Sequence, residues 1–217
     1  MKFNNCPFCH CPKLYTLKNS YLKCKECHRK FSPKKLELDL KIIDFFCDDY
    51  NALETSKVLK LNYRTVQNRF TLFRKLCTTY LDNLYQNSIV EKSSYEEHYF
   101  FTQKDKIKKS KSIYNAINII GFYSNDIVFT LLMPPLPKPN DEFEDKSFEK
   151  YLKWHKIYSA ENQTSVLREF WLFLDDSLKR YKGINPVNFI YYLKECEFKF
   201  NFSKNRQNAI LKELFLL

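Results

Sequence analysis

Four cysteines near the start of the chain have the spacing of metal ligands. They form two CxxC pairs, Cys6 with Cys9 and Cys24 with Cys27, and fourteen residues separate the pairs. Two tight turns of this kind present four thiolates tetrahedrally to one Zn²⁺, and the stretch between them has the length of a β-hairpin. We therefore expect a structural zinc ribbon over residues 1–35.

Neighbouring side chains leave the ligand set partly open. Cys11, His10 and His28 lie beside the pairs and are alternative ligands, with His28 the strongest substitute, although a solvated histidine is the simpler interpretation. Four unrelated free thiols are the competing interpretation of the pairs. That interpretation is disfavoured because paired CxxC motifs at this spacing are rare by chance.

The composition narrows the classes of function. The chain has 217 residues, 44% hydrophobic content and a formal net charge of +11. This excess favours a polyanionic partner, although a lysine-rich coding background would also produce it. The sequence has two glycines and neither a P-loop nor a dinucleotide-binding motif. It shows no signal-peptide pattern and no apolar run of about 20 residues, so we expect a cytoplasmic, nucleoid-associated protein without membrane insertion.

Residues 36–90 have the periodicity of a small helical bundle. A first apolar-periodic segment is followed by a second helix at residues 52–59 and a third from Tyr63, with Asn62 as a good N-cap. A short helix, a tight turn and a helix with polar first turns is the layout of a helix-turn-helix. An ordinary three-helix bundle with a solvated polar face is the alternative, and the adjoining ribbon favours DNA recognition.

The first turns of this third helix supply the residues that we expect to contact double-stranded DNA. Arginine pairs bidentately with guanine in the major groove, and asparagine or glutamine pairs with adenine. A basic loop farther along the chain adds two lysines suited to phosphates. The predicted DNA-contacting residues are Tyr63, Arg64, Thr65, Gln67, Asn68, Arg69, Lys108 and Lys109.

From residue 91 the pattern changes to strands and then returns to helices. Aromatic and β-branched runs predict three antiparallel strands, the last two joined as a hairpin: residues 95–101, 113–123 and 127–133. A proline-rich break and an acidic patch follow. Helical spacing then predicts three further helices that begin near Ser165, Asn185 and Asn205.

This order of elements resembles that of small bacterial insertion-sequence transposases with an RNase H-like DDE domain. The resemblance is most specific in three stretches: Phe170-Trp171, Lys179-Arg180-Tyr181-Lys182-Gly183-Ile184 and Leu193-Lys194-Glu195-Cys196-Glu197-Phe198-Lys199-Phe200-Asn201-Phe202. It covers most of residues 1–133 loosely and residues 165–213 well. It implies an α+β chain with three domains. They are a zinc ribbon at 1–35, a helix-turn-helix domain at 36–90 and a truncated RNase H-like domain at 91–217, with a three-stranded antiparallel sheet and C-terminal helices.

The resemblance also implies metal-dependent cut-and-join chemistry on DNA. In that family two divalent ions held by acidic side chains activate water or a DNA 3′-hydroxyl. Here Glu96 stands at the first position in place of aspartate, and Asp145 is the candidate remnant of the second. At the third position Ser165 aligns, and Glu169 or Glu161 would have to stand in. We expect the set Glu96, Asp145 and Glu169 to be degraded, with Mg²⁺ needed only if catalysis survives.

Three functions fit these patterns. The first is a DNA-binding relative of transposases that has lost its metal-dependent site, and the second is an active DDE-type transposase with divergent carboxylates. The third is a zinc-ribbon interaction module whose partner is RNA or another protein. Clustering of Glu96, Asp145 and Glu161 around one ion would favour the second function. By analogy with transposases, a homodimer or a larger assembly is also expected.

Overall fold

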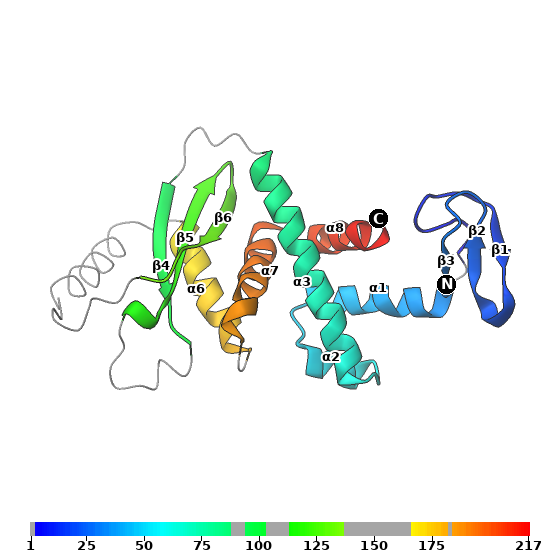
Figure 1. The fold of residues 1–217 in the computed structure, drawn as a ribbon, viewed down its shortest axis with the longest axis horizontal. Coiled ribbons are helices and arrows are strands. Elements are labelled where there is room, and N and C mark those ends of the chain that lie inside the picture. The colour runs from blue at the N-terminus through cyan, green and yellow to red at the C-terminus, as the bar shows by residue number, and fades with distance from the viewer. Residues whose placement is uncertain (1–2, 88–93, 103–112, 137–165, 182–183) are drawn as a thin grey trace. The chain divides into compact units, whose positions relative to one another are not determined.

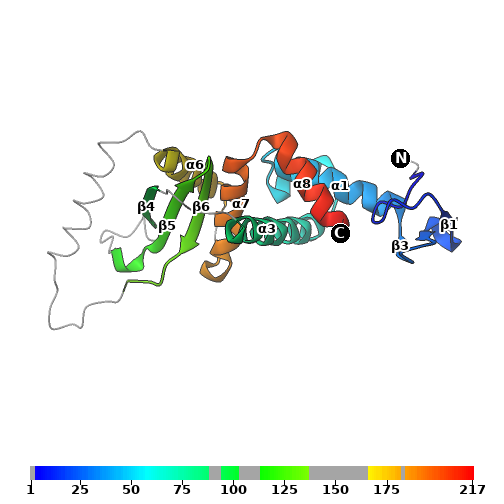
Figure 2. The same cartoon turned by 90° about the horizontal axis from the view of Figure 1, so that it is seen from above.

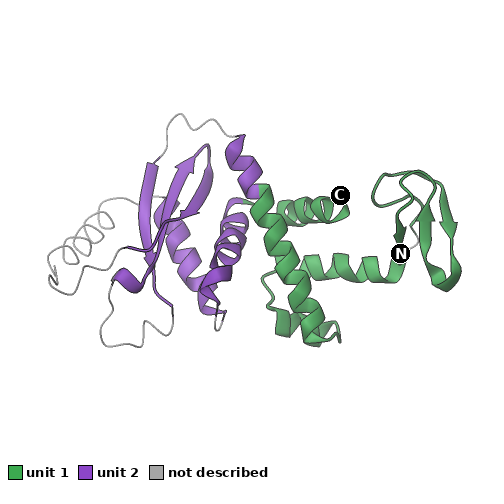
Figure 3. Ribbon diagram, in the orientation of Figure 1, with its two compact units in different colours: residues 1–80, 202–217 green, residues 81–201 purple. Residues whose placement is uncertain are grey.

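The computed structural model of the protein describes residues 3–87, 94–102, 113–136, 166–181 and 184–217. It forms two compact units, one of residues 1–80 and 202–217 and the other of residues 81–201 (Figure 3). Helix α8 (Lys204–Leu216) therefore belongs to the first unit, whereas the sequence-based prediction includes it in the domain at residues 91–217. None of the described helices is both long and apolar enough to cross a bilayer.

The first unit begins with a small antiparallel sheet. Its strands, in spatial order, are β1 (Leu14–Thr16), β2 (Leu22–Cys24) and β3 (Lys30–Phe31), and η1 (Lys18–Ser20) is a 3₁₀ turn between the first two. The predicted hairpin is present, and β3 adds a third strand that the sequence did not predict. Phe31 is buried and its ring meets those of Phe3 and Phe8 edge-on, which gives this sheet a small apolar core.

Three helices follow the sheet, and local side chains fix where they begin. They are α1 (Pro33–Cys47), α2 (Ala52–Val58) and α3 (Tyr63–Gln86). Ser32 caps α1 by accepting a hydrogen bond from the Lys35 N–H, and proline occupies the first helical position. Asn51 and Glu54 form a reciprocal capping box at the start of α2.

The ends of α1 and α2 turn the chain sharply without glycine. At the end of α1 the Tyr50 N–H donates to the Phe45 carbonyl at 3.1 Å, and the two rings pack edge-on at 5.0 Å. Asp49, between the helices, takes the left-handed conformation with φ of 65°. At the end of α2, Lys60 does the same with φ of 53°. Both ends are Schellman motifs, in which most proteins place glycine at the left-handed position.

Helix α8 packs against α1 and α3 inside the first unit. The rings of Phe46 and Phe73 meet edge-on at 5.6 Å, and Phe215 of α8 meets Phe73 at 6.0 Å. Polar contacts reinforce this packing, because Asp44 of α1 accepts a hydrogen bond from Asn208 at 2.6 Å and lies 2.7 Å from Lys212. The bundle that positions α3 thus includes a helix from the far end of the sequence.

The second unit holds a second antiparallel sheet. Its strands, in spatial order, are β4 (Ser94–Phe100), β5 (Ile117–Ser124) and β6 (Ile127–Leu132), and η2 (Ile113–Asn115) precedes β5. Asn125 and Asp126, with φ of 51° and 61°, make the two-residue turn of the predicted hairpin. Helix α6 (Val166–Lys179) covers one face (Figures 1 and 2). The three predicted antiparallel strands are therefore confirmed, except that residues 113–115, predicted as the start of the second strand, form η2.

Helix α7 (Phe189–Asn201) follows the 3₁₀ turn η3 (Pro186–Asn188). Its side chains form hydrogen bonds with the outer edge of β6. Asn201 accepts from the Val128 N–H at 2.9 Å and donates to the Val128 carbonyl at 2.7 Å. Glu197 accepts from the N–H of Thr130, and Lys194 donates to its carbonyl, both at 2.9 Å. These α7 side chains therefore satisfy backbone groups that a further strand would otherwise pair.

Candidate metal centre and nucleic-acid interface

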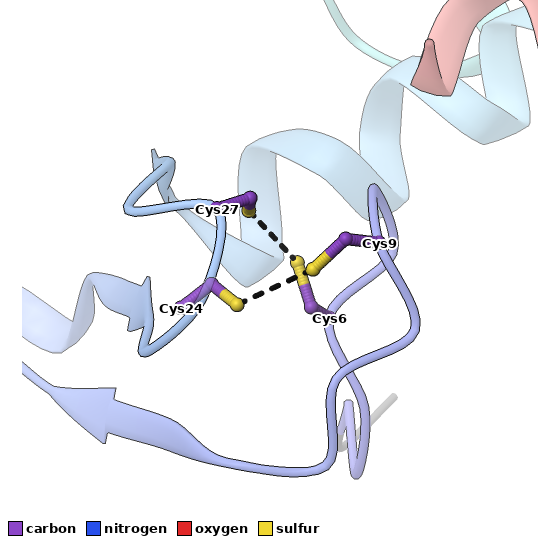
Figure 4. A group of neighbouring side chains, drawn as sticks. All are labelled: Cys6, Cys9, Cys24 and Cys27. Carbon is purple, nitrogen blue, oxygen red and sulfur yellow. Dashed lines mark hydrogen bonds between the residues drawn. The ribbon is translucent and has the colours of Figure 1, made fainter.

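The four predicted zinc ligands come together in the first unit (Figure 4). Their Sγ atoms all lie within 4.8 Å of one another. The Sγ atoms of Cys6 and Cys27 are 3.7 Å apart, and those of Cys9 and Cys24 are 3.4 Å apart. Tetrahedral zinc with Zn–S bonds of about 2.3 Å has sulfur–sulfur edges of about 3.8 Å. The cluster therefore fits one zinc ion held by four thiolates.

The two CxxC turns have the same backbone arrangement. Each first cysteine donates its N–H to the carbonyl five residues later, at 2.8 Å for Cys6 and 3.1 Å for Cys24. The residue after each second cysteine, His10 or His28, has a positive φ of 60° or 57°. Both histidine side chains are at least partly exposed, and neither joins the sulfur cluster within the described chain. Each histidine occupies the left-handed position of its turn.

The pKa values of the thiols indicate how a bound cation would change the charge of the cluster. Burial opposes ionisation of Cys24, yet the N–H groups of Cys27 and Glu26 lower its pKa to about 6. Cys27 receives the Arg29 N–H, but burial and the neighbouring thiols raise its pKa to about 12. Without a cation the crowded sulfurs cannot all be ionised. A bound Zn²⁺ would compensate four thiolates and displace their protons.

Helix α3 exposes most of the residues predicted to contact DNA. The Asn62 side chain caps the helix by accepting a hydrogen bond from the Arg64 N–H at 2.8 Å, as expected for an N-cap. Gln67 is half-buried. The exposed members of the predicted set are Tyr63, Arg64, Thr65 and Asn68. Arg64 and Asn68 are four residues apart, so they share one helix face.

Arg69 differs from the rest of the set because its guanidinium is held within the unit. Its Nε and Nη2 donate to the two carboxylate oxygens of Asp39 at 2.7 and 2.8 Å, and its guanidinium carbon lies 5.9 Å from the Phe215 ring. Asp39 is 7% exposed, and this burial raises its pKa even though Arg69 acts in the opposite direction. The bidentate pair joins α3 to α1. A DNA contact by Arg69 stays a prediction.

The candidate catalytic residue Glu96 lies on β4 and accepts a hydrogen bond from a side chain of α6. The Trp171 indole N–H donates to Glu96 Oε2 at 3.1 Å. Directly opposite Glu96 on β5 stands Gly121, and a Cβ there would lie 2.5 Å from the indole ring. Glycine therefore leaves the space in which Trp171 lies against the sheet. The sequence suggested neither this hydrogen bond nor this role for Gly121.

His98, on the same strand as Glu96, also contacts side chains of α6. Its ring lies parallel to that of Trp171 at 4.8 Å, and its Nε2 is 3.4 Å from Asp175 Oδ1. Trp171 and Asp175 are four residues apart on α6, which is the one sequence signal that could have paired them. Glu169 is exposed on the same helix. Across the described ranges, the four cysteines are the one group of His, Cys, Asp or Glu side chains with metal-binding spacing.

Several predicted site residues cannot be compared with the structure. Lys108 and Lys109, the predicted phosphate contacts, lie outside the described residues. The same holds for the carboxylates Asp145 and Glu161 and for Ser165. The expectation that the set Glu96, Asp145 and Glu169 is degraded therefore stays a prediction, and the clustering of Glu96, Asp145 and Glu161 that would favour an active enzyme is not tested.

Comparison with known proteins yields one informative similarity. No family model matches the chain, and no solved structure matches it. An uncharacterized transposase-like protein of Haemophilus influenzae is 34% identical over 77 residues, which cover 34% of this chain and 63% of that protein. The chain thus spans less than two thirds of that relative's length. The similarity supports a relationship to transposase-like proteins at most.

Proposed function

We propose that this chain is a transposase-like DNA-binding protein. In this proposal the ribbon holds a structural Zn²⁺, the α2–turn–α3 segment is a helix-turn-helix, and the second unit is a truncated RNase H-like domain with a degraded metal site. The observation that carries the proposal is the exposed polar start of α3, where Arg64, Thr65 and Asn68 follow a capped helix end. The similarity to a transposase-like protein supports the same class of partner.

Recognition would use the first two turns of α3 in the major groove. Arg64 has the donors for guanine N7 and O6, and Asn68 has the donor and acceptor for adenine N6 and N7. Each good bidentate contact contributes about 1–3 kcal/mol of discrimination against the wrong base. The Asp39–Arg69 pair would act indirectly, because it fixes the direction in which the exposed residues of α3 project.

The metal-dependent site would be degraded because its first carboxylate has acquired another partner. Two-metal catalysis needs carboxylates around ions about 3.5–4 Å apart. Glu96 instead accepts a hydrogen bond from Trp171 beneath α6, and Glu169 of α6 is exposed. We propose that Glu96 now serves the packing of α6 on the sheet. Nicking or strand transfer with Mg²⁺ or Mn²⁺ that disappears in Glu96→Gln would instead establish an active DDE-type transposase.

Selection from a random duplex library tests the DNA-binding proposal. The zinc-loaded chain should enrich a defined sequence, and Asn68→Ala or Arg64→Ala should relax the preference at one or two base pairs. Arg206→Ala is the matched control, because Arg206 is exposed on α8 of the same unit. If both α3 variants enrich the same sequence as the unmodified chain, α3 is not the element that recognises the bases. A chain that binds no duplex would leave the zinc-ribbon interaction module as the better function.

A further inference from the structure

We infer that the ribbon sheet carries a second nucleic-acid site, a face that binds single-stranded DNA. The strand register, extended at one end by the hydrogen bond from the Leu17 N–H to the Tyr21 carbonyl at 2.7 Å, places four lysines and two tyrosines on one side of the sheet. We name this side the lysine–tyrosine face: Lys13, Tyr15, Tyr21, Lys23, Lys25 and Lys30. Tyr15 lies opposite Lys23, and Lys23 lies opposite Lys30, so these three form a row across the sheet. The Lys25 N–H donates to the Lys13 carbonyl at 3.1 Å, which continues the register by one step.

The alternation of a β-strand explains why this face is polar. Side chains of successive residues point to opposite sides of a sheet. Leu14, Cys24 and Phe31 occupy the other side, where Leu14 packs on the cysteine cluster and Phe31 is buried. The lysine–tyrosine face is therefore the side that the ribbon core does not use.

The aromatic side chains on this face are accessible. Tyr15 is 54% exposed and Tyr21 is 44% exposed, so neither ring contributes mainly to the core. Lys13, Lys25 and Lys30 are exposed as well, and Lys23 is half-buried. None of the four lysines forms a salt bridge with a described residue.

The lysines exceed what the metal centre needs for charge balance. Residues 3–31 hold six Lys or Arg residues and one Glu, a net charge of +5. A zinc ion with four thiolates carries a charge of −2, because Zn²⁺ compensates two of the four. A net charge of about +3 therefore remains on the ribbon after the metal is bound, and an external polyanion is the complementary partner.

The tyrosines decide which polyanion fits best. Single-stranded nucleic acid binds to basic surfaces on which exposed aromatic rings stack with unpaired bases. Duplex DNA offers phosphates to the lysines but keeps its bases paired and stacked. The lysine–tyrosine face is a separate surface from the polar start of α3, and its binding does not require that α3 read a duplex.

The test measures the fluorescence anisotropy of a labelled oligothymidine with the zinc-loaded full chain at several salt concentrations. Lys23→Gln with Lys30→Gln should lower the slope of log affinity against log salt by about 1.4, since each phosphate contact on a single strand contributes about 0.7. Tyr15→Leu should lower affinity about fivefold or more with an unchanged slope. Lys34→Gln with Lys41→Gln, two exposed lysines of α1, is the matched control and should change neither quantity.

Cobalt substitution verifies folding, because the Co²⁺ absorption of a tetrathiolate site must be the same in every variant. The inference is overturned if the ribbon variants bind oligothymidine as the unmodified chain does, or if the α1 control loses as much affinity. It is also overturned if Tyr15→Leu has no effect while polyglutamate competes as well as oligothymidine. Arg64→Ala should leave oligothymidine binding intact, so a failure of the α3 proposal is recognised separately.

Discussion

Gly121 provides a direct test of how α6 sits on the sheet. In Gly121→Ala the new Cβ would lie 2.5 and 2.7 Å from two carbons of the Trp171 ring and 3.2 Å from Leu167 Cδ2. Carbon atoms in contact are normally about 3.5–4.0 Å apart, so the indole must retreat by about 1 Å. Overpacking of this kind costs about 1–3 kcal/mol, and loss of the hydrogen bond to Glu96 adds about 1 kcal/mol. We expect unfolding of the second unit to become easier by about 2–4 kcal/mol.

Urea denaturation followed by far-ultraviolet circular dichroism measures this effect, because that signal does not depend on Trp171 and is therefore available for every variant, including one that lacks this ring. The control is a double-mutant cycle with Trp171→Leu, which removes the ring that the new methyl group would meet. In that background Gly121→Ala should cost about 1 kcal/mol or less. An equal cost in both backgrounds would refute the close approach of Trp171 to β5 as the reason for glycine.

Three further predictions concern other parts of the chain. Cys9→Ser should abolish the Co²⁺ tetrathiolate spectrum and unfold the ribbon while the helical circular dichroism persists, because the metal supplies much of the stability of so small a region. Lys60→Gly should raise the free energy of unfolding by about 1 kcal/mol in urea melts, since glycine relieves the cost of φ at 53°. Burial raises the pKa of Glu197 in the folded chain above its ordinary 4.5. The protonated side chain therefore contributes fully to stability below the pKa that it has in the unfolded chain. This contribution is lost as pH rises through its pKa in the folded chain. Glu197→Gln should therefore flatten the fall in stability of the second unit above about pH 4.5, and a constant difference between the two proteins across this range would contradict the assignment.

Local patterns in the sequence predicted the metal cluster and most elements, because their determinants are close neighbours in the chain. The CxxC turns bring Cys6 near Cys9 and Cys24 near Cys27 before any tertiary contact forms. The Asn125–Asp126 turn likewise fixes the hairpin through its own dihedral angles. By contrast, β3 has two residues, which is too short to show a period of two.

Contacts between distant residues were not accessible from the sequence. The Trp171–Glu96 hydrogen bond joins positions 75 residues apart, and the Arg69–Asp39 pair joins positions 30 residues apart. A polar arginine early in α3 has the same sequence signature whether it faces solvent or a buried aspartate. The sequence of α8 shows that the helix has an apolar side but not which surface this side covers. The packing of α8 on Phe73 in the first unit is therefore seen only in the structure.

The central claim, that the polar start of α3 on a zinc-stabilised unit binds duplex DNA, is tested most directly by the salt dependence of duplex binding. The measurement is the affinity of the zinc-loaded chain for its selected duplex over a range of salt concentrations, with Arg64→Ala and Arg206→Ala in parallel. The account predicts a steep loss of affinity with salt, at about 0.9 per phosphate contact, and a weakened, less selective complex for Arg64→Ala alone. Affinity that is weak, insensitive to salt and equal in all three proteins would contradict it.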